Sequence, residues 1–235
     1  MIPSDQVSRI RTVLFDLDGT LADTAPDLAF ALNQILAEEN QEERPFEQIR
    51  PVVSHGGIAL LQFGFNMDPG TQGFERLRDR FLQLYRHHIA DQTRLFPGME
   101  ELLDALENRG INWGVVTNKP AWLTNPLLEA LKLRDRAACV VSGDSTKYRK
   151  PHPEPMLHAC RIAGSDAVEC LYVGDAKRDI EAGRRAGMKT LVALFGYLGP
   201  DDRPESWHAD GMIEQPVNVL DWIESQTAAS LVTTK

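Results

Sequence analysis

Polar side chains follow four short apolar runs of the chain, at the point where each run ends. Asp16 follows Val13-Leu14-Phe15 and opens the segment Asp16-Leu17-Asp18-Gly19-Thr20. The other three runs end at Thr117-Asn118, at Ser142 and at Gly174-Asp175. Short apolar runs predict buried strands, and the carboxyl ends of parallel strands form a ligand crevice. Any one run could instead end in an ordinary turn, which favours the same residue types. Because all four end this way, we expect their ends to meet at one site.

These residue types suit the binding of a metal ion and a phosphate group. Asp16, Asp18 and Asp175 can place carboxylate oxygens on one hard cation, and Mg²⁺ suits such a set because it leaves room for a substrate phosphate. The hydroxyl and backbone N–H groups of Gly19-Thr20 and Thr117-Asn118 are suitable donors to phosphate oxygens.

Lys150 follows the third of these strands, in the segment Arg149-Lys150-Pro151. Its ammonium group can supply the fixed positive charge that a transferring phosphoryl group needs. A carboxylate can attack phosphorus once metal and lysine offset the repulsion between the two anions. The residues therefore predict phosphoryl-transfer chemistry at this edge of a sheet.

The elements that must position these residues alternate between strand and helix after residue 98. We expect strands at 113–116, 139–141, 171–173 and 190–194, and helices at 99–108, 123–131, 155–163 and 179–186. Alternation of this kind predicts βαβ units. The expected fold is α/β, Rossmann-like, with a parallel sheet covered by helices on both faces.

A helical insertion separates the first strand from the others. Apolar residues recur at helical spacing from residue 25 to 39, where Thr24 is the expected N-cap, and helical patterns continue to about residue 89 with no convincing strand. We therefore expect an α/β core formed by residues 1–22 and 97–235, and a helical cap domain formed by residues 23–96.

Composition narrows the class of protein. The 235 residues carry a net charge of −9, which disfavours nucleic acid as a partner. No apolar run approaches a membrane span, and the polar N-terminal residues 1–11 lack the apolar region of a signal peptide. With three cysteines, no disulfide framework or zinc site is indicated, and Cys139 and Cys170 are expected to be buried thiols. The expectation is a cytoplasmic monomer or weak homodimer that binds a small phosphorylated metabolite and no membrane.

Four motifs, in order along the chain, resemble those of the haloacid dehalogenase superfamily. The motifs are Asp16-Leu17-Asp18-Gly19-Thr20-Leu21, Thr117-Asn118, Lys150-Pro151 and Gly174-Asp175-Ala176-Lys177-Arg178-Asp179. The resemblance extends over essentially the whole chain, and the insertion resembles the small helical cap of this superfamily.

The resemblance implies a role for each motif residue. Asp16 is the expected nucleophile, and Asp18 the general acid and then base. Mg²⁺ is expected on Asp16, the backbone carbonyl of Asp18, and Asp175. Thr117 and Lys150 are expected to bind the phosphoryl group, with Lys147 as a rival to Lys150. Asp179, one helical turn after Asp175, is expected to orient a metal-bound water or Lys150.

The cap is expected to close over the site and to contact the leaving group. Candidate binding residues are Arg50, His55, Gly56 and Gly57, together with Thr20 and Asn118 in the core. Arg86, His87 and His88 are alternatives, but such clusters more often belong to a solvated helix surface. A passive packing module is the alternative interpretation of the whole cap.

Several chemistries occur in this superfamily, and the residues present narrow the choice. Dehalogenases lack the second aspartate, which is present here as Asp18. Phosphonoacetaldehyde hydrolases need a cap lysine, whereas residues 1–118 contain no lysine. The same absence disfavours the β-phosphoglucomutases. A phosphomonoesterase remains, with a non-enzymatic protein that binds a phosphorylated metabolite as a remote alternative.

Within the phosphatases the chain resembles the phosphoglycolate phosphatase branch. Several segments are similar to the N-acetylmuramic acid 6-phosphate phosphatases of peptidoglycan recycling, above all Phe195-Gly196-Tyr197 followed by Trp207-His208-Ala209-Asp210. This similarity implies N-acetylmuramic acid 6-phosphate as the substrate, with 2-phosphoglycolate as the alternative. The sugar acid needs an open cap pocket, and phosphoglycolate needs a tight one.

Overall fold

The structure is a computed structural model that describes residues 10–232. The N-terminal residues 1–11, for which no signal peptide is expected, lie largely outside these residues. Six parallel strands form one sheet in the order β5-β4-β1-β6-β7-β8. In sequence order the sheet strands are β1 (Thr12–Phe15), β4 (Asn112–Val116), β5 (Cys139–Val141), β6 (Cys170–Gly174), β7 (Lys189–Ala193) and β8 (Gly211–Ile213).

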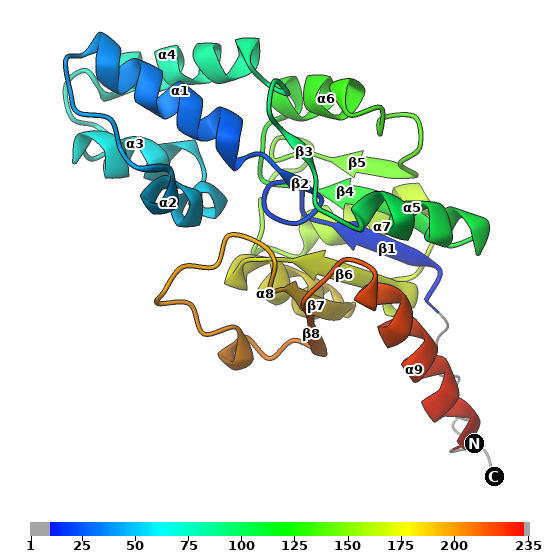
Figure 1. The fold of residues 1–235 in the computed structure, drawn as a ribbon. Helices are drawn as coiled ribbons and strands as arrows, with labels where there is room; N and C mark the ends of the chain where they lie inside the picture. Colours follow the sequence, from blue (N-terminus) through cyan, green and yellow to red (C-terminus); the bar gives the residue numbers. More distant parts are fainter. Residues whose placement is uncertain (1–9, 233–235) are drawn as a thin grey trace.

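Helices cover both faces of this sheet, as the alternation predicted (Figure 1). The helices that follow the sheet strands or precede them are α5 (Met99–Asn108), α6 (Ala121–Ala130), α7 (Glu154–Ala163), α8 (Lys177–Ala186) and α9 (Asn218–Val232). Along β1, Val13 and Phe15 face one buried cluster, whereas Leu14 faces the other, which also holds Tyr172 and Met156 of α7. Because successive strand residues point to opposite faces, both faces of β1 are buried. β1 therefore lies at the centre of the core.

The expected elements differ from the observed ones mainly beyond residue 194. Strand β8 and helix α9 had no counterpart in the sequence expectations, and the two-residue strand β3 (Arg94–Leu95) lies where no strand was expected. β3 pairs with β2 (Ala22–Asp23) in a separate antiparallel ribbon. This ribbon joins the outgoing and returning chain where the helical insertion leaves the sheet.

The insertion consists of helices that lie apart from the sheet on one side of the molecule (Figure 1). They are α1 (Ala25–Glu38), α2 (Phe46–Ile49), the 3₁₀ helix η1 (Arg50–His55), α3 (Gly57–Phe65) and α4 (Phe74–His87). Short 3₁₀ helices also occur at η2 (Ala167–Glu169) and η3 (Pro204–Ser206). The division into a core and a cap with boundaries at residues 23 and 96 stays a prediction.

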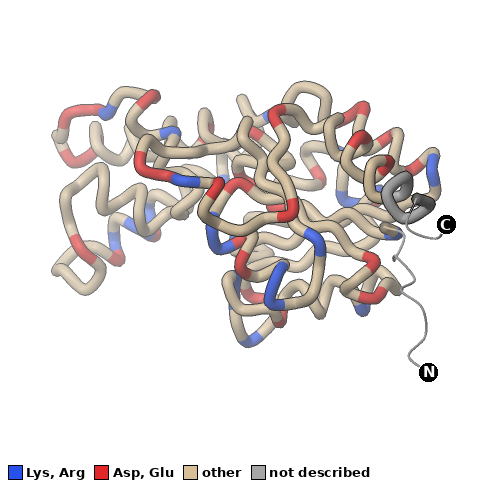
Figure 2. Tube along the Cα trace, turned by 90° about the horizontal axis from the view of Figure 1, so that it is seen from below, with Lys and Arg blue, Asp and Glu red and all other residues tan. Residues whose placement is uncertain are grey.

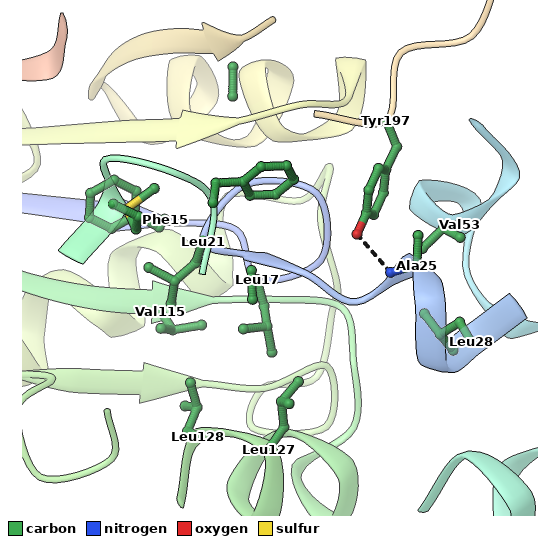
Figure 3. Close-up of a cluster of buried hydrophobic side chains, with 14 of the residues drawn as sticks. Phe15, Leu17, Leu21, Ala25, Leu28, Val53, Val115, Leu127, Leu128 and Tyr197 are labelled. Atoms are coloured by element: carbon green, nitrogen blue, oxygen red, sulfur yellow. Dashed lines mark hydrogen bonds between the residues drawn. The ribbon is translucent and has the colours of Figure 1, made fainter. Parts of the chain in front are cut away.

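The start of α1 corrects one expectation. Thr24 is the N-cap residue, but its hydroxyl makes no capping bond; it donates to Asp18 Oδ1 at 2.6 Å. The phenol oxygen of Tyr197 accepts instead from the backbone N–H groups of Thr24 at 2.7 Å and Ala25 at 2.9 Å. Figure 3 shows the bond to Ala25. A side chain from beyond β7 thus satisfies two backbone donors at this helix end.

Acidic and basic residues are interspersed along the chain (Figure 2). Among the described residues no helix is long and apolar enough to cross a membrane. All three cysteines are buried free thiols, as expected for Cys139 and Cys170.

Candidate active site

Lys150 lies at the centre of a buried group of polar side chains at the carboxyl end of β1. Its Nζ is 2.8 Å from Asp16 Oδ1 and 2.8 Å from Asp179 Oδ1. Nζ also donates to the hydroxyl of Tyr172 at 2.9 Å, and that hydroxyl donates to the backbone carbonyl of Val116 at 2.8 Å. A buried ammonium group needs this set of partners, because a buried charge without them is costly. Lys147, the rival candidate, is exposed.

Asp175 follows β6 and is fully enclosed by donors. Its Oδ2 accepts from the Ser54 hydroxyl at 2.6 Å and from the backbone N–H of Tyr197 at 2.9 Å, and its Oδ1 accepts from Thr20 at 3.4 Å. Burial, followed by the charges of Asp179 and Asp16, raises the pKa of Asp175 to about 7. The donors from Ser54 and Tyr197 only partly offset this rise. The hydrogen-bond donors around Asp175 therefore do not supply enough positive charge to keep its pKa at the ordinary value.

Carboxylate oxygens of Asp16, Asp175 and Asp179 lie within 4.8 Å of one another. Burial is also the main reason why the pKa of Asp179 is raised, although Lys150 opposes the rise. Three buried carboxylates outnumber the two positive groups that interact with them, Lys150 and Arg178, and a divalent cation would neutralise this negative excess. Gly19, at φ +87°, keeps this centre compact, because a Cβ there would collide with the Asp175 carboxylate. The donor set thus fits a hard cation.

Asp18 differs from the expected arrangement in where its side chain points. Its Oδ1 is 2.6 Å from Lys119 Nζ and accepts from Thr24 at 2.6 Å, and its carboxylate is not part of the acidic cluster found among the described residues. Burial alone would lower the pKa of Lys119, but the neighbouring Asp18 raises it above its ordinary value. The backbone carbonyl of Asp18, which the resemblance implies as a metal ligand, stays a prediction.

Asn118 holds the Lys150 segment in place. Its side-chain amide donates to the backbone carbonyl of Lys150 at 3.0 Å, and its carbonyl oxygen accepts from the Lys150 N–H at 3.0 Å. Thr117 is buried at the end of β4, and its hydroxyl accepts from the Lys119 N–H at 3.1 Å. Gly143 allows the loop after β5 to approach the loop after β4 closely, because a Cβ at this position would collide with the Asn118 backbone.

A cavity of about 650 Å³ lies between these strand ends and the inserted helices. Its polar lining from the core includes Asp16, Asp18, Thr117, Asn118, Lys119 and Arg149. His55, Gly56 and Gly57 line it from the insertion, together with the apolar side chains of Ile58, Phe81 and Leu82. Trp122 of α6 borders it and is 48 % exposed.

Two of the expected binding residues lie elsewhere. Arg50 stands over the ring of Tyr197, with its guanidinium carbon 4.7 Å from the ring centroid, and donates to the backbone carbonyl of Gly196 and to Asp23. Thr20 is buried and donates to Asp175. Arg50 therefore links the insertion to the loop after β7, and Thr20 supports a carboxylate of the acidic cluster.

The sequence analysis missed several residues of this site. Lys119 directly follows Thr117-Asn118, so its place at a strand end was a usable signal. Ser54 and Tyr85 gave no such signal, because a serine in a short helix and a tyrosine on the apolar face of α4 are both common in packing roles. Arg178, which donates to the backbone carbonyl of Ser54, lay within the fourth motif but received no role.

Comparison with known proteins shows which family this chain resembles in sequence and in fold. Residues 13–193 match the family described as haloacid dehalogenase-like hydrolase. An N-acetylmuramic acid 6-phosphate phosphatase of Pseudomonas putida is 42 % identical over 217 residues, which cover 92 % of this chain and 97 % of the relative. A phosphoglycolate phosphatase of Xanthomonas campestris pv. campestris is 45 % identical over 207 residues, which cover 88 % and 93 %. The solved structure of a predicted phosphoglycolate phosphatase from Haemophilus somnus 129PT is 27 % identical, with a TM-score of 0.81 over 91 % of this chain and 98 % of that one.

Proposed function

The chain belongs to the haloacid dehalogenase-like hydrolase family and is a phosphatase, and we propose that it hydrolyses N-acetylmuramic acid 6-phosphate with Mg²⁺ through an aspartyl-phosphate intermediate. The predicted cytoplasmic location and place in peptidoglycan recycling belong to this proposal. So do the roles of the individual residues given below.

The proposed metal ligands are Asp16, Asp175 and the backbone carbonyl of Asp18. Asp179 belongs to the same acidic cluster, and its contact with Lys150 supports a role in positioning that lysine. The raised pKa of Asp175 supports the proposal, because a divalent cation would relieve the excess of buried negative charge. When bound, Mg²⁺ would supply positive charge against the phosphoryl oxygens.

Asp16 is the proposed nucleophile. Its Oδ2 attacks phosphorus while its Oδ1 stays with Lys150, which contributes positive charge to the transition state. The bond between phosphorus and the ester oxygen breaks as Asp18 gives its proton to that oxygen. A water molecule then attacks phosphorus, Asp18 takes the proton back from the water, and the carboxylate of Asp16 is released with inorganic phosphate.

The volume of the cavity carries the choice of substrate. At about 650 Å³, it lies within the roughly 300–1,000 Å³ range of pockets that take drug-sized ligands. A phosphorylated sugar acid is of that size, whereas phosphoglycolate would leave most of the cavity empty. The apolar side chains of Ile58, Leu82 and Trp122 provide a surface for the less polar parts of an amino sugar.

The test is phosphate release with Mg²⁺ from N-acetylmuramic acid 6-phosphate and from 2-phosphoglycolate, compared by kcat/KM. We expect a preference of about a hundredfold or more for the sugar acid, which corresponds to about 2.7 kcal/mol of transition-state discrimination. A preference for phosphoglycolate would overturn the substrate and keep the catalytic roles. If neither compound is hydrolysed, the proposal as a whole would be overturned.

A further inference from the structure

Lys119 and Tyr85 form a buried pair where the inserted helices meet the strand ends. Tyr85 belongs to α4 of the insertion, and Lys119 follows β4 of the sheet. The ammonium nitrogen lies 4.6 Å from the centroid of the Tyr85 ring, a cation–π distance. Only 6 % of the Lys119 side chain is exposed, and 1 % of Tyr85. Both residues line the cavity of about 650 Å³.

The hydroxyl of Tyr85 is buried and its O–H has no hydrogen-bond acceptor among the described residues, although Lys119 interacts with its oxygen. A buried hydroxyl without a partner is unfavourable, and such groups in native proteins call for an explanation. Burial raises the pKa of Tyr85 to about 12, so the group is a neutral donor at ordinary pH. A donor that faces the cavity without an acceptor points to an acceptor on the ligand.

Lys119 also has capacity left for a ligand. An ammonium group has three N–H donors, and among the described residues Lys119 Nζ donates to Asp18 Oδ1 at 2.6 Å and interacts with the Tyr85 oxygen, which leaves a donor for a ligand. The acidic side chains that line the cavity are Asp16 and Asp18, and Asp16 is already paired with Lys150. The basic side chains Arg78, Arg149 and Arg178 line it as well. An anionic acceptor would therefore meet a surplus of positive side chains.

We propose that Lys119 Nζ and Tyr85 Oη together bind a carboxylate of the leaving group. This inference rests on the proposed phosphatase function and names the feature of the substrate that the enzyme selects. One carboxylate oxygen can accept from the ammonium and the other from the hydroxyl, which satisfies both donors. Because Tyr85 comes from the insertion and Lys119 from the core, such a ligand would hold the two together.

The test compares substrates that differ by a carboxylate. The first pair is N-acetylmuramic acid 6-phosphate and N-acetylglucosamine 6-phosphate, which lacks the lactyl carboxylate. The second pair is 2-phosphoglycolate and ethyl phosphate. For each pair the quantity measured is the ratio of kcat/KM for the acid over kcat/KM for the partner without it. The pairs distinguish a carboxylate on a sugar from one close to the ester oxygen.

Tyr85→Phe and Lys119→Met should each lower this ratio at least about tenfold in one of the two pairs, because a hydrogen bond to a charged group is lost. The ratio is used because Lys119 also contacts Asp18, and a disturbance of Asp18 slows both members of a pair alike. Should Lys119→Met fail to fold, Tyr85→Phe, which removes a single oxygen, still provides the test.

The chain offers a matched control in Lys147 and Tyr148. These residues also form a cation–π pair, at 5.0 Å, but both are exposed and neither lines the cavity. Lys147→Met and Tyr148→Phe should leave both ratios unchanged. Ratios that stay within about twofold of the wild type in both pairs, for folded Tyr85 and Lys119 variants, would overturn the carboxylate subsite alone. Absence of turnover by the wild type on all four compounds would overturn the proposed substrate together with the subsite.

Discussion

The hydroxyl of Ser54 donates to Asp175 Oδ2 across 2.6 Å, and this bond joins the helical insertion to the acidic cluster at the sheet edge. Ser54 lies near the end of η1 and lines the cavity from the side of the insertion. Its side chain is buried. Arg178 of the fourth motif donates to the backbone carbonyl of the same residue. The position of the insertion and the state of the acidic cluster are therefore coupled through Ser54.

Ser54→Ala should weaken this coupling. The hydroxyl lowers the pKa of Asp175, so its removal should raise that pKa further and shift the pH at which Mg²⁺ activates the enzyme upward. The measurement is phosphate release against Mg²⁺ concentration at pH 6, 7 and 8. Ser225→Ala, which removes a hydroxyl bonded within α9, is the control. An activation profile identical to that of the wild type at every pH would contradict the coupling.

Asp16→Asn should abolish phosphate release without unfolding the protein. The amide is a poor nucleophile, and Lys150 keeps its ion pair with Asp179 at 2.8 Å, so the buried ammonium is not left without a partner. Phosphate release and the thermal unfolding midpoint should be measured on the same preparation. Near-native turnover by this variant would remove Asp16 from the role of nucleophile.

Asp175→Ala should weaken activation by Mg²⁺, because a hard cation loses an anionic ligand. We expect the Mg²⁺ concentration for half-maximal activity to rise at least about tenfold. Asp144→Ala is a suitable control, since Asp144 is exposed and accepts from the backbone N–H of Ala121 outside the acidic cluster. An unchanged activation curve for Asp175→Ala would show that this carboxylate is not a ligand.

The sequence predicted the parts of this site that depend on local pattern. Asp16, Thr117 and Asp175 were found because apolar runs end at them, and the ends of parallel strands must meet at one edge of the sheet. The partners of these residues depend on contacts between distant segments. Tyr197 and Ala25, for instance, are 172 positions apart, and no periodicity links them.

The same reasoning applies to the insertion. Arg50 was a candidate binding residue together with His55 and the Gly56-Gly57 pair, and η1 places it against Tyr197 at the base of the insertion, outside the cavity lining. Tyr85 was hidden because the apolar face of α4 looks like ordinary core. Outside the insertion, strand β8 was missed because Gly211–Ile213 is an edge strand in which only Ile213 is buried, so no apolar run marks it.

The metal-free protein should lose stability as pH rises from about 4 to about 7. The pKa of Asp175 is raised from 3.8 to about 7 in the folded state, so between these values the folded protein binds more protons than the unfolded chain. The free energy of unfolding must then fall with pH across this window, by up to about 4 kcal/mol for this group. Above about pH 7 the whole of this decrease in the free energy of unfolding has taken place.

Denaturant unfolding in the presence of EDTA, at pH values from 4.5 to 8, measures this dependence. Asp175→Asn should flatten the pH profile, because the variant has no group to ionise at this position. Added Mg²⁺ should restore stability to the wild type most strongly above pH 7, since it binds the folded protein with the carboxylate ionised. A wild-type profile that is flat or rises over this window would contradict the raised pKa.

Tyr197→Phe should destabilise the base of the insertion. The phenol oxygen accepts from the N–H groups of Thr24 and Ala25, and the bond to Ala25 is drawn in Figure 3. It donates to Asp23 Oδ1 at 2.7 Å, at the point where β2 passes into α1. Its removal leaves two buried backbone donors without this acceptor, which should cost about 1–3 kcal/mol of unfolding free energy. Tyr148→Phe, at an exposed position, should cost little. The ring of Tyr197 and its backbone hydrogen bond to Asp175 are kept in the variant. Activation by Mg²⁺ should therefore be retained while the free energy of unfolding falls. A loss of Mg²⁺ activation with unchanged stability would mean that the hydroxyl acts on the acidic cluster and not on the start of α1.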